Sequence, residues 1–280
     1  MDIQLKDGLE YLKSVKKNSV DLILTDPPYI ISRDTGMNEH YNIIKENESN
    51  QVAFVKTEEE WLEYKKKLEK PQEELEADKG KGWSKENYLQ YGCILGKKYA
   101  VKTDYGKWDS EFTMETLDKF IKEYYSKLRK GGTLIIWFDM WKLESLKKIM
   151  ENSKFKQIRL IEWVKTNPQP RNSSINYLTN CREVALLGVK GGKPTFNSKY
   201  DNGIYSYPFQ GGKNRFHPTQ KSLLLFEDLI IKHSNEGDTI MDTFLGSGTT
   251  AIACKNTKRL FKGCEVSKEY LDKAMKIING

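Results

Sequence analysis

The segment Asp26-Pro27-Pro28-Tyr29 carries the residue types best suited to chemistry in this sequence. It follows the apolar run 19–25, which predicts a strand, and its two prolines end any regular element there. The carboxylate of Asp26 and the carbonyl of Pro27 can accept the two hydrogens of an exocyclic amine, and Tyr29 can stack on the ring that bears it. The alternative is an ordinary X-Pro-Pro turn with a surface tyrosine.

A second candidate is the glycine turn 242–250, between a predicted strand and a predicted helix. Its glycines, Gly246 and Gly248, allow a tight turn and let a ligand approach the backbone. One strand later, Glu265 stands at a strand end, where a carboxylate can accept both ribose hydroxyls of a nucleoside. The alternative is that Glu265 only neighbours a helix N-cap. A nicotinamide-dependent dehydrogenase is disfavoured because the glycines lack the GxGxxG spacing.

Both candidates are placed by strands that alternate with helices, which predicts an α/β fold with a mostly parallel sheet and helices on both faces. In such sheets, ligands bind at the carboxyl ends of the strands. The glycines of Arg129-Lys130-Gly131-Gly132 are expected to end the helix that precedes them. The predicted strands are 3–5, 19–25, 133–138, 156–164, 182–189, 239–242 and 260–264, and the predicted helices are 7–15, 114–128, 141–152, 219–233, 249–256 and 268–278.

Together, the two motifs resemble the amino-methyltransferases of DNA. The similar segments are Asp26–Tyr29 after Val-Asp-Leu-Ile, and Phe244–Thr250, with further similarity at Leu5–Glu10, Leu128–Leu134, Trp163–Pro168 and His217–Lys221. The resemblance covers nearly the whole chain except about 33–107. Because Asp-Pro-Pro-Tyr precedes the glycine turn, the motif order is similar to the β group of the family. This implies a Rossmann-like, circularly permuted fold dependent on S-adenosyl-L-methionine, with the two termini close together.

The resemblance also implies roles for matching residues. Asp26, Pro27, Pro28 and Tyr29 hold a flipped base, and Glu265 takes the ribose hydroxyls of the cofactor. Thr243 and Ser222 stand where the family has proline, beside the contact residues. The expected cofactor-binding set is Asp7, Gly8, His217, Thr219, Lys221, Asp242, Phe244, Gly246, Ser247, Gly248, Thr249 and Glu265, with Asp7 at the strand end that recognises the cofactor's adenine, and Thr219 and Lys221 near the cofactor's carboxylate.

Positive charge is concentrated in one part of the chain. Residues 165–221 hold nine Lys or Arg, two acids and seven Tyr or Phe, so this window carries the whole formal net charge of +7. Basic residues mixed with aromatics suit DNA phosphates and bases, although a basic solvated loop is the alternative. The region 168–215 is therefore predicted to read the target sequence. Its candidate DNA contacts are Arg171, Arg182, Lys193, Lys199, Lys213 and Arg215.

Residues 33–107 read as a helical and loop insertion into a single catalytic domain that spans 1–280. The segment 58–76 is rich in Glu and Lys, which favours a solvated excursion without chemistry. A DNA-reading role for the stretch 79–85 is the alternative.

The composition indicates a globular protein of the cytoplasm. No apolar run is long enough to span a bilayer, and the first residues lack the pattern of a signal peptide. The four cysteines form no CxxC pair and offer no metal-ligand spacing with the three histidines, so we expect reduced thiols and no metal.

The expected reaction is methylation of a flipped-out adenine at N6, by direct attack of the amine on the cofactor's methyl group. Within the family, aspartate at the first motif position favours adenine, so Asp26 supports this base. The alternatives are N4 of cytosine, a structured RNA, or a catalytically inactive DNA-binding subunit. Duplex DNA is the expected partner, with single strands left open. The resemblance also raises a homodimer and a cognate restriction endonuclease as candidate partners.

Overall fold

The computed structural model describes residues 1–30, 56–67, 85, 88–89, 112–168, 181–209 and 220–279. The chain divides into two compact units, Met1–Ile30 with Asp109–Gly280, and Ile31–Trp108. The predicted insertion at 33–107 falls in the second unit. There, helix α3 (Glu58–Lys67) presents Tyr64, whose ring stacks with both Trp61 and Tyr88.

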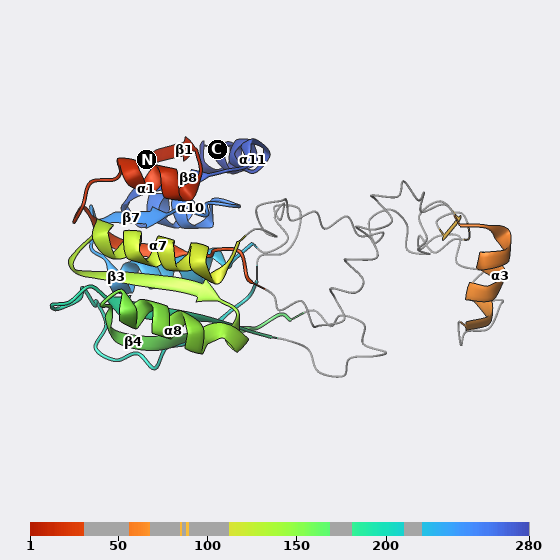
Figure 1. Ribbon diagram of the computed structural model, residues 1–280, viewed down its shortest axis with the longest axis horizontal. Helices are drawn as coiled ribbons and strands as arrows, with labels where there is room; N and C mark the ends of the chain where they lie inside the picture. The colour runs from red at the N-terminus through yellow and green to blue at the C-terminus, as the bar shows by residue number, and fades with distance from the viewer. Residues whose placement is uncertain are drawn as a thin grey trace. The chain divides into compact units, whose positions relative to one another are not determined.

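The first unit is built on a sheet whose described part has eight strands, in the order β1-β8-β7-β2-β3-β5-β4-β6 (Figure 1). Strand β5 is antiparallel to both of its neighbours, and the other neighbouring pairs are parallel. The strands are β1 (Asp2–Leu5), β2 (Val20–Thr25), β3 (Leu128–Phe138), β4 (Lys156–Lys165), β5 (Arg182–Val189), β6 (Ile204–Tyr207), β7 (Thr239–Asp242) and β8 (Leu260–Glu265).

Helices cover both faces of this sheet, because successive strand residues point to opposite sides. Ile23 of β2 packs into one apolar cluster, whereas Leu22 and Leu24 pack into the other. The first cluster lies under α1 (Gly8–Ser14), α7 (Met114–Lys127) and α8 (Leu143–Asn152), which follows the 3₁₀ turn η1 (Met140–Lys142). The second lies under α9 (Leu223–His233), α10 (Thr249–Asn256) and α11 (Lys268–Asn279). The predicted α/β fold class is confirmed.

The first strand lies beside the last one. β1 pairs in parallel with β8, with Leu5 opposite Glu265, and Figure 1 shows the N-terminus close to the C-terminal helix α11. This is the circularly permuted arrangement that the motif order predicts. The carboxyl ends of β1, β8, β7, β2, β3, β4 and β6 consequently lie along one edge of the sheet, where the antiparallel β5 begins; Leu5, Glu265, Asp242 and Thr25 end the first four of these strands. We call it the catalytic edge.

Two details differ from the sequence-based expectation. The Arg-Lys-Gly-Gly run 129–132 does not cap α7 but already belongs to β3, because Leu128 is extended and pairs with Val20. The run forms a register shift in which Gly131, at φ +78°, donates its N–H to the carbonyl of Lys190. Strand β6 was not predicted: it lies within the supposed DNA-reading region and pairs with β4.

Candidate active site

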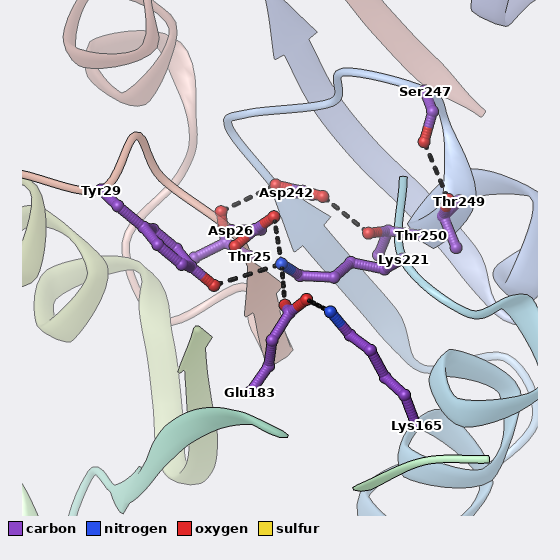
Figure 2. Close-up of polar contacts among 10 residues, drawn as sticks. All are labelled: Thr25, Asp26, Tyr29, Lys165, Glu183, Lys221, Asp242, Ser247, Thr249 and Thr250. Carbon is purple, nitrogen blue, oxygen red and sulfur yellow. Dashed lines mark hydrogen bonds and ion pairs between the residues drawn. The ribbon is translucent and has the colours of Figure 1, made fainter. Parts of the chain in front are cut away.

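Asp26 follows the last residue of β2 and therefore stands at the middle of the catalytic edge. The preceding residue, Thr25, donates its hydroxyl to Asp242 Oδ1 at 2.7 Å (Figure 2). The other oxygen of Asp242 accepts the hydroxyl of Thr250 at 2.6 Å, and Oδ1 also accepts the N–H of Phe244. Asp242 is buried, so these bonds fix the end of β2 to the glycine turn and to the start of α10.

Lys221 joins Asp26 to a second carboxylate. Its Nζ lies 2.9 Å from Asp26 Oδ2 and 2.6 Å from Glu183 Oε2, and it donates to the hydroxyl of Tyr29 at 3.2 Å. The other oxygen of Glu183 pairs with Lys165. Only 6% of the Lys221 side chain is exposed, so its charge is held almost entirely by these neighbours. Figure 2 shows the four charged groups in sequence, Lys165, Glu183, Lys221 and Asp26.

The ionisation states follow from burial and from this alternation of charge. Burial alone would lower the pKa of Lys221, but Asp26 and Glu183 outweigh it and hold that pKa well above its ordinary value. Burial would raise the pKa of Glu183, yet the two lysines bring it down to about 2. Glu183 is therefore ionised at neutral pH. For Asp26, burial raises the pKa and Lys221 opposes the shift, so this carboxylate is a better hydrogen-bond acceptor than an exposed one.

One oxygen of Asp26 is left for another partner. Oδ1 is buried and accepts no hydrogen bond from the described residues, whereas Oδ2 is held by Lys221. A buried polar oxygen without a partner is costly, because it has lost its water and gained nothing in return. An amine donor placed there would satisfy it.

Tyr29 is half-buried beside the same groups. Its ring meets Phe138, at the end of β3, edge to face with centroids 6.1 Å apart. The ammonium of Lys221 lies 5.2 Å from the ring centroid, within range of a cation–π contact. The segment Asp26-Pro27-Pro28-Tyr29 therefore joins a carboxylate and an aromatic ring at one point of the sheet edge.

The other half of the catalytic edge has the features of a nucleoside site. Glu265 is buried at the end of β8, where its Oε2 accepts the N–H of Gly246 at 2.8 Å and its Oε1 accepts the N–H of Ser267 at 2.9 Å. Each carboxylate oxygen can accept a further hydrogen, so two ribose hydroxyls fit this group. Asp7 caps α1 with Oδ1 and lies just beyond the strand paired with β8. The residues present therefore fit a nucleoside cofactor.

The glycine turn packs against α7 through aromatic side chains. Phe244 lies 4.9 Å from Phe120, centroid to centroid, and Gly8 leaves no room for a side chain because a Cβ there would stand 2.7 Å from Phe120. Thr243, which replaces the family's proline, bonds through its hydroxyl to Tyr124. Gly248 adopts the left-handed conformation, at φ +78°, directly before α10. Ser247 and Thr249 share a hydrogen bond of 2.9 Å.

The structure divides the predicted cofactor residues into two groups. In the first group, Asp7 and Gly8 follow the strand paired with β8, and Gly246 of the glycine turn donates its N–H to Glu265. Asp242 differs, because its carboxylate is consumed by protein hydrogen bonds and serves to join strands. Lys221 was expected near the cofactor's carboxylate, but its ammonium lies on Asp26 and Glu183 instead. His217 and Thr219 lie outside the described residues.

The three predicted DNA contacts that the structure describes are not brought together. Arg182 begins β5 opposite Val164, at the catalytic edge, and 63% of its side chain is exposed. Lys193 and Lys199 follow the C-terminal end of β5. The carbonyl of Lys193 lies against Gly131, near the start of β3. Close to Lys199, the N–H of Asn197 donates to the carbonyl of Lys232, at the end of α9. These two lysines therefore lie at the opposite end of the sheet. Arg171, Lys213 and Arg215 lie outside the described residues.

Some of the basic and aromatic residues in the 165–221 window are structural. Lys190 donates to Asn18 and to the carbonyl of Leu128, and therefore ties loops together. Tyr205 is buried in the core under α9, with its hydroxyl on Asp201. Tyr205 therefore cannot serve as an exposed platform for a DNA base.

The residues that sequence reasoning missed at this site are Glu183, Lys165 and Thr25. Lys165 stands in the Trp-Val-Lys-Thr-Asn-Pro segment that resembles the family, which is a usable signal. Glu183 was visible only as one of two acids in a basic window, and Thr25 only as the end of an apolar strand. In the described part of the chain, no group of three or more His, Cys, Asp or Glu could hold a metal ion, and no helix could cross a membrane.

Comparisons with known proteins agree with this geometry. A family model described as DNA methylase matches residues 20–276. The type II methyltransferase M2.LlaDCHI of Lactococcus lactis subsp. cremoris is 27% identical over 98% of this chain and 87% of its own length. M2.DpnII of Streptococcus pneumoniae is 32% identical over 63% of this chain and 72% of its own length.

Solved structures share the fold. The M1.HpyAVI–SAM complex superposes with a TM-score of 0.61 at 24% identity, covering 100% of this chain and 99% of that one. The PvuII DNA methyltransferase, described as cytosine-N4-specific, gives 0.62 at 14% identity, covering 98% and 84%. The family match spans most of the chain and includes both halves of the catalytic edge, so this chain belongs to the DNA methylase family, the amino-methyltransferases of DNA.

Proposed function

We propose that this chain is a site-specific DNA methyltransferase that transfers a methyl group from S-adenosylmethionine to N6 of a flipped-out adenine. The hydrogen bonding of the two carboxylate oxygens of Asp26 is the observation that supports this proposal. Its Oδ2 is held by Lys221, whereas its buried Oδ1 has no hydrogen-bond partner among the described residues. An exocyclic amine supplies the missing donor at that atom.

The amine must leave the base stack to reach this site, since it is otherwise engaged in pairing. Its lone pair is delocalised into the ring, which makes it a weak nucleophile. Asp26 Oδ1 and the Pro27 carbonyl, which accept its two hydrogens, would draw the nitrogen toward tetrahedral geometry and localise the lone pair. Tyr29, half-buried against Phe138, would hold the flipped ring by stacking. Positioning and electrostatics, rather than a covalent enzyme nucleophile, would then provide the rate.

Glu265, Asp7 and the turn that contains Gly246 and Gly248 would hold the cofactor. When bound, S-adenosylmethionine supplies a methyl group on a positively charged sulfur. Glu265 would accept the ribose hydroxyls, because each of its oxygens retains a lone pair beyond the bonds from Gly246 and Ser267. Phe244 is fixed against Phe120 and would form the apolar wall beside the bound cofactor.

Adenine is favoured over cytosine by Asp26 itself, since aspartate at the first position of the motif is associated with adenine in the family. The second candidate is cytosine N4, and the fold shared with a neighbour described as cytosine-N4-specific supports it. Both bases present an amine to the same carboxylate, so the two candidates share the role of Asp26 and differ in the ring held by Tyr29.

The DNA is expected to approach the catalytic edge beside Arg182. The region 168–215 remains our proposal for sequence reading, without Lys193 and Lys199, which lie at the far end of the sheet. The relatives named as type II methyltransferases support a role beside a cognate restriction endonuclease.

Methylation-sensitive sequencing of DNA from cells that express this chain tests the proposal. We expect N6-methyladenine in one short recurrent motif, and none in cells expressing Asp26→Ala. N4-methylcytosine at a recurrent motif would show that the target is cytosine and not adenine. Unmethylated DNA from cells that contain folded wild-type protein would refute both candidate functions.

A further inference from the structure

The charged groups behind Asp26 form a connected series that the reaction described above does not use. We propose that Lys165 and Glu183 are positioning residues for methyl transfer: through Lys221 they fix Asp26 so that Oδ1 faces the amine. This inference rests on the proposed function, because it concerns the same carboxylate.

The series runs across three segments of the chain. Lys165 is the last residue of β4, Glu183 is the second residue of β5, and Lys221 precedes α9. Lys165 pairs with Glu183 Oε1, Glu183 Oε2 lies 2.6 Å from Lys221, and Lys221 lies 2.9 Å from Asp26 Oδ2. Positive and negative groups alternate, so each inner group has an opposite charge on both sides.

The series is better explained by positioning than by stability. A buried ion pair gives little net stability, since removing two charges from water costs about as much as their attraction returns. If Lys221 faced Asp26 alone, its ammonium could bridge both carboxylate oxygens. Glu183 instead draws Lys221 to one side, where it holds Oδ2 and leaves Oδ1 without a partner among the described residues.

Lys165 has a separate task in this arrangement. Without it, Glu183 would carry an excess negative charge close to Asp26, and the two carboxylates would compete for the single ammonium of Lys221. Its place is fixed by the backbone, because the N–H of Lys165 donates to the carbonyl of Cys181 at 2.7 Å, beside the start of β5. The series therefore rests on paired strands.

The test uses four variants of the full chain. Glu183→Gln and Lys165→Met each remove one charge at nearly constant size, and Lys165→Arg retains the charge. The matched control is Glu162→Gln, which removes the pair with Arg182 between the same two strands, β4 and β5, without touching the series. Each protein is assayed for the maximal rate of labelled-methyl transfer from S-adenosylmethionine to unmethylated genomic DNA, and for cofactor affinity by calorimetry.

We expect Glu183→Gln and Lys165→Met to lose about tenfold or more in maximal rate, the scale of a misplaced reacting group, with cofactor affinity within about twofold of wild type. Lys165→Arg should recover most of the rate, and Glu162→Gln should keep it. Wild-type rates in both charge-removing variants would overturn the proposal. So would equal losses of rate and cofactor affinity, because these would indicate a general structural role.

A second measurement separates this inference from the proposed function. The label counts methyl transfer to any base, so a cytosine target leaves the test intact. If wild type transfers no label, the proposed function fails, and the pKa of Asp26 measured by ¹³C NMR still decides the positioning claim. Among the described residues, the charged or titratable groups facing Asp26 are Lys221, Glu183, Tyr29 and Asp242. Glu183→Gln should lower the pKa of Asp26 and Lys165→Met should raise it; an unchanged pKa in both would overturn the proposal.

Discussion

The hydroxyl of Thr25 donates a 2.7 Å hydrogen bond to Asp242, although the two residues stand 217 positions apart in the chain. Thr25 ends the strand that leads into Asp26, and Asp242 ends the strand that leads into the glycine turn. Since both residues are buried, this one bond joins the part of the site that would hold the base to the part that would hold the cofactor.

Removing the hydroxyl of Thr25 should therefore weaken both the fold and the reaction. We expect Thr25→Val, which keeps the side-chain shape, to lower the free energy of unfolding by about 1–3 kcal/mol, the cost of leaving a buried acceptor underused. The maximal rate should also fall, by roughly tenfold, because the part of the site that would hold the base is no longer fixed relative to the part that would hold the cofactor. Chemical denaturation and methyl-transfer assays measure these effects. Thr239→Val, at the other end of β7, is the control, and a Thr25→Val protein that matches it in both measurements would contradict this role.

Titration of Asp242 should lower the free energy of unfolding as the pH rises, whereas most carboxyl groups lower it as the pH falls. Burial raises its pKa from 3.8 to about 6, against the hydrogen bonds from Thr250 and Thr25. Folding therefore favours the protonated form of Asp242. Its contribution to the free energy of unfolding is complete below pH 3.8 and is lost as the pH rises through about 6. The loss amounts to roughly 3 kcal/mol.

Denaturation of wild type and Asp242→Asn across that interval measures this effect, since the variant does not titrate there. The free energy of unfolding of wild type, relative to the variant, should fall as the pH rises. The contribution of Glu183, whose pKa is lowered from 4.5 to about 2, is lost only as the pH falls below 4.5, and it is common to wild type and variant. A difference that stays constant with pH would show that Asp242 titrates normally.

Glu265 should control cofactor affinity. We expect Glu265→Ala to weaken S-adenosylmethionine binding by about 1–3 kcal/mol, the usual effect of lost hydrogen bonds to a charged acceptor. Calorimetry measures this directly. Glu236→Ala serves as the control, because Glu236 precedes β7 at the opposite end of the sheet and its side chain is 65% exposed. Equal affinity in the two variants would remove Glu265 from the cofactor site.

The position of each basic residue should decide its effect on DNA binding. Arg182 lies at the catalytic edge and Lys193 at the opposite end of the sheet. For a duplex bound at the catalytic edge, Arg182→Ala should lower affinity and make the salt dependence shallower by about one unit of slope. Lys193→Ala should change neither. Fluorescence titrations at several salt concentrations test both, and the reverse result would place the duplex on the far end.

Much of the fold could be predicted because its signals are local. Apolar runs such as 19–25, bounded by prolines or glycines, identify strands, and the motif order predicted that β1 would lie beside β8. Strand β6 was missed because it is only four residues long and its outward positions are polar or exposed. Gly131 was misread because a left-handed glycine serves a register shift as well as a helix end.

The site was predicted where chemistry and sequence adjacency coincide, as at Asp26 and Tyr29. The parts that were missed depend on side chains that meet only after folding. Nothing local in the sequence indicates that Glu183 would face Lys221, since that contact follows from the reversed direction of β5. For the same reason, the charge total of the 165–221 window could not show that Lys165 and Lys221 are neutralised inside the protein while Lys193 lies at the far end.

Methylation of adenine through Asp26 is tested directly by mass spectrometry, which identifies the methylated nucleoside in DNA treated with S-adenosylmethionine and purified wild type or Asp26→Ala. Wild type should yield N6-methyladenine, and an Asp26→Ala protein that still binds the cofactor with near-normal affinity should yield none. N4-methylcytosine as the product would contradict the assignment of the base. Near-normal yield from Asp26→Ala would contradict the role of Asp26 as the acceptor for the amine.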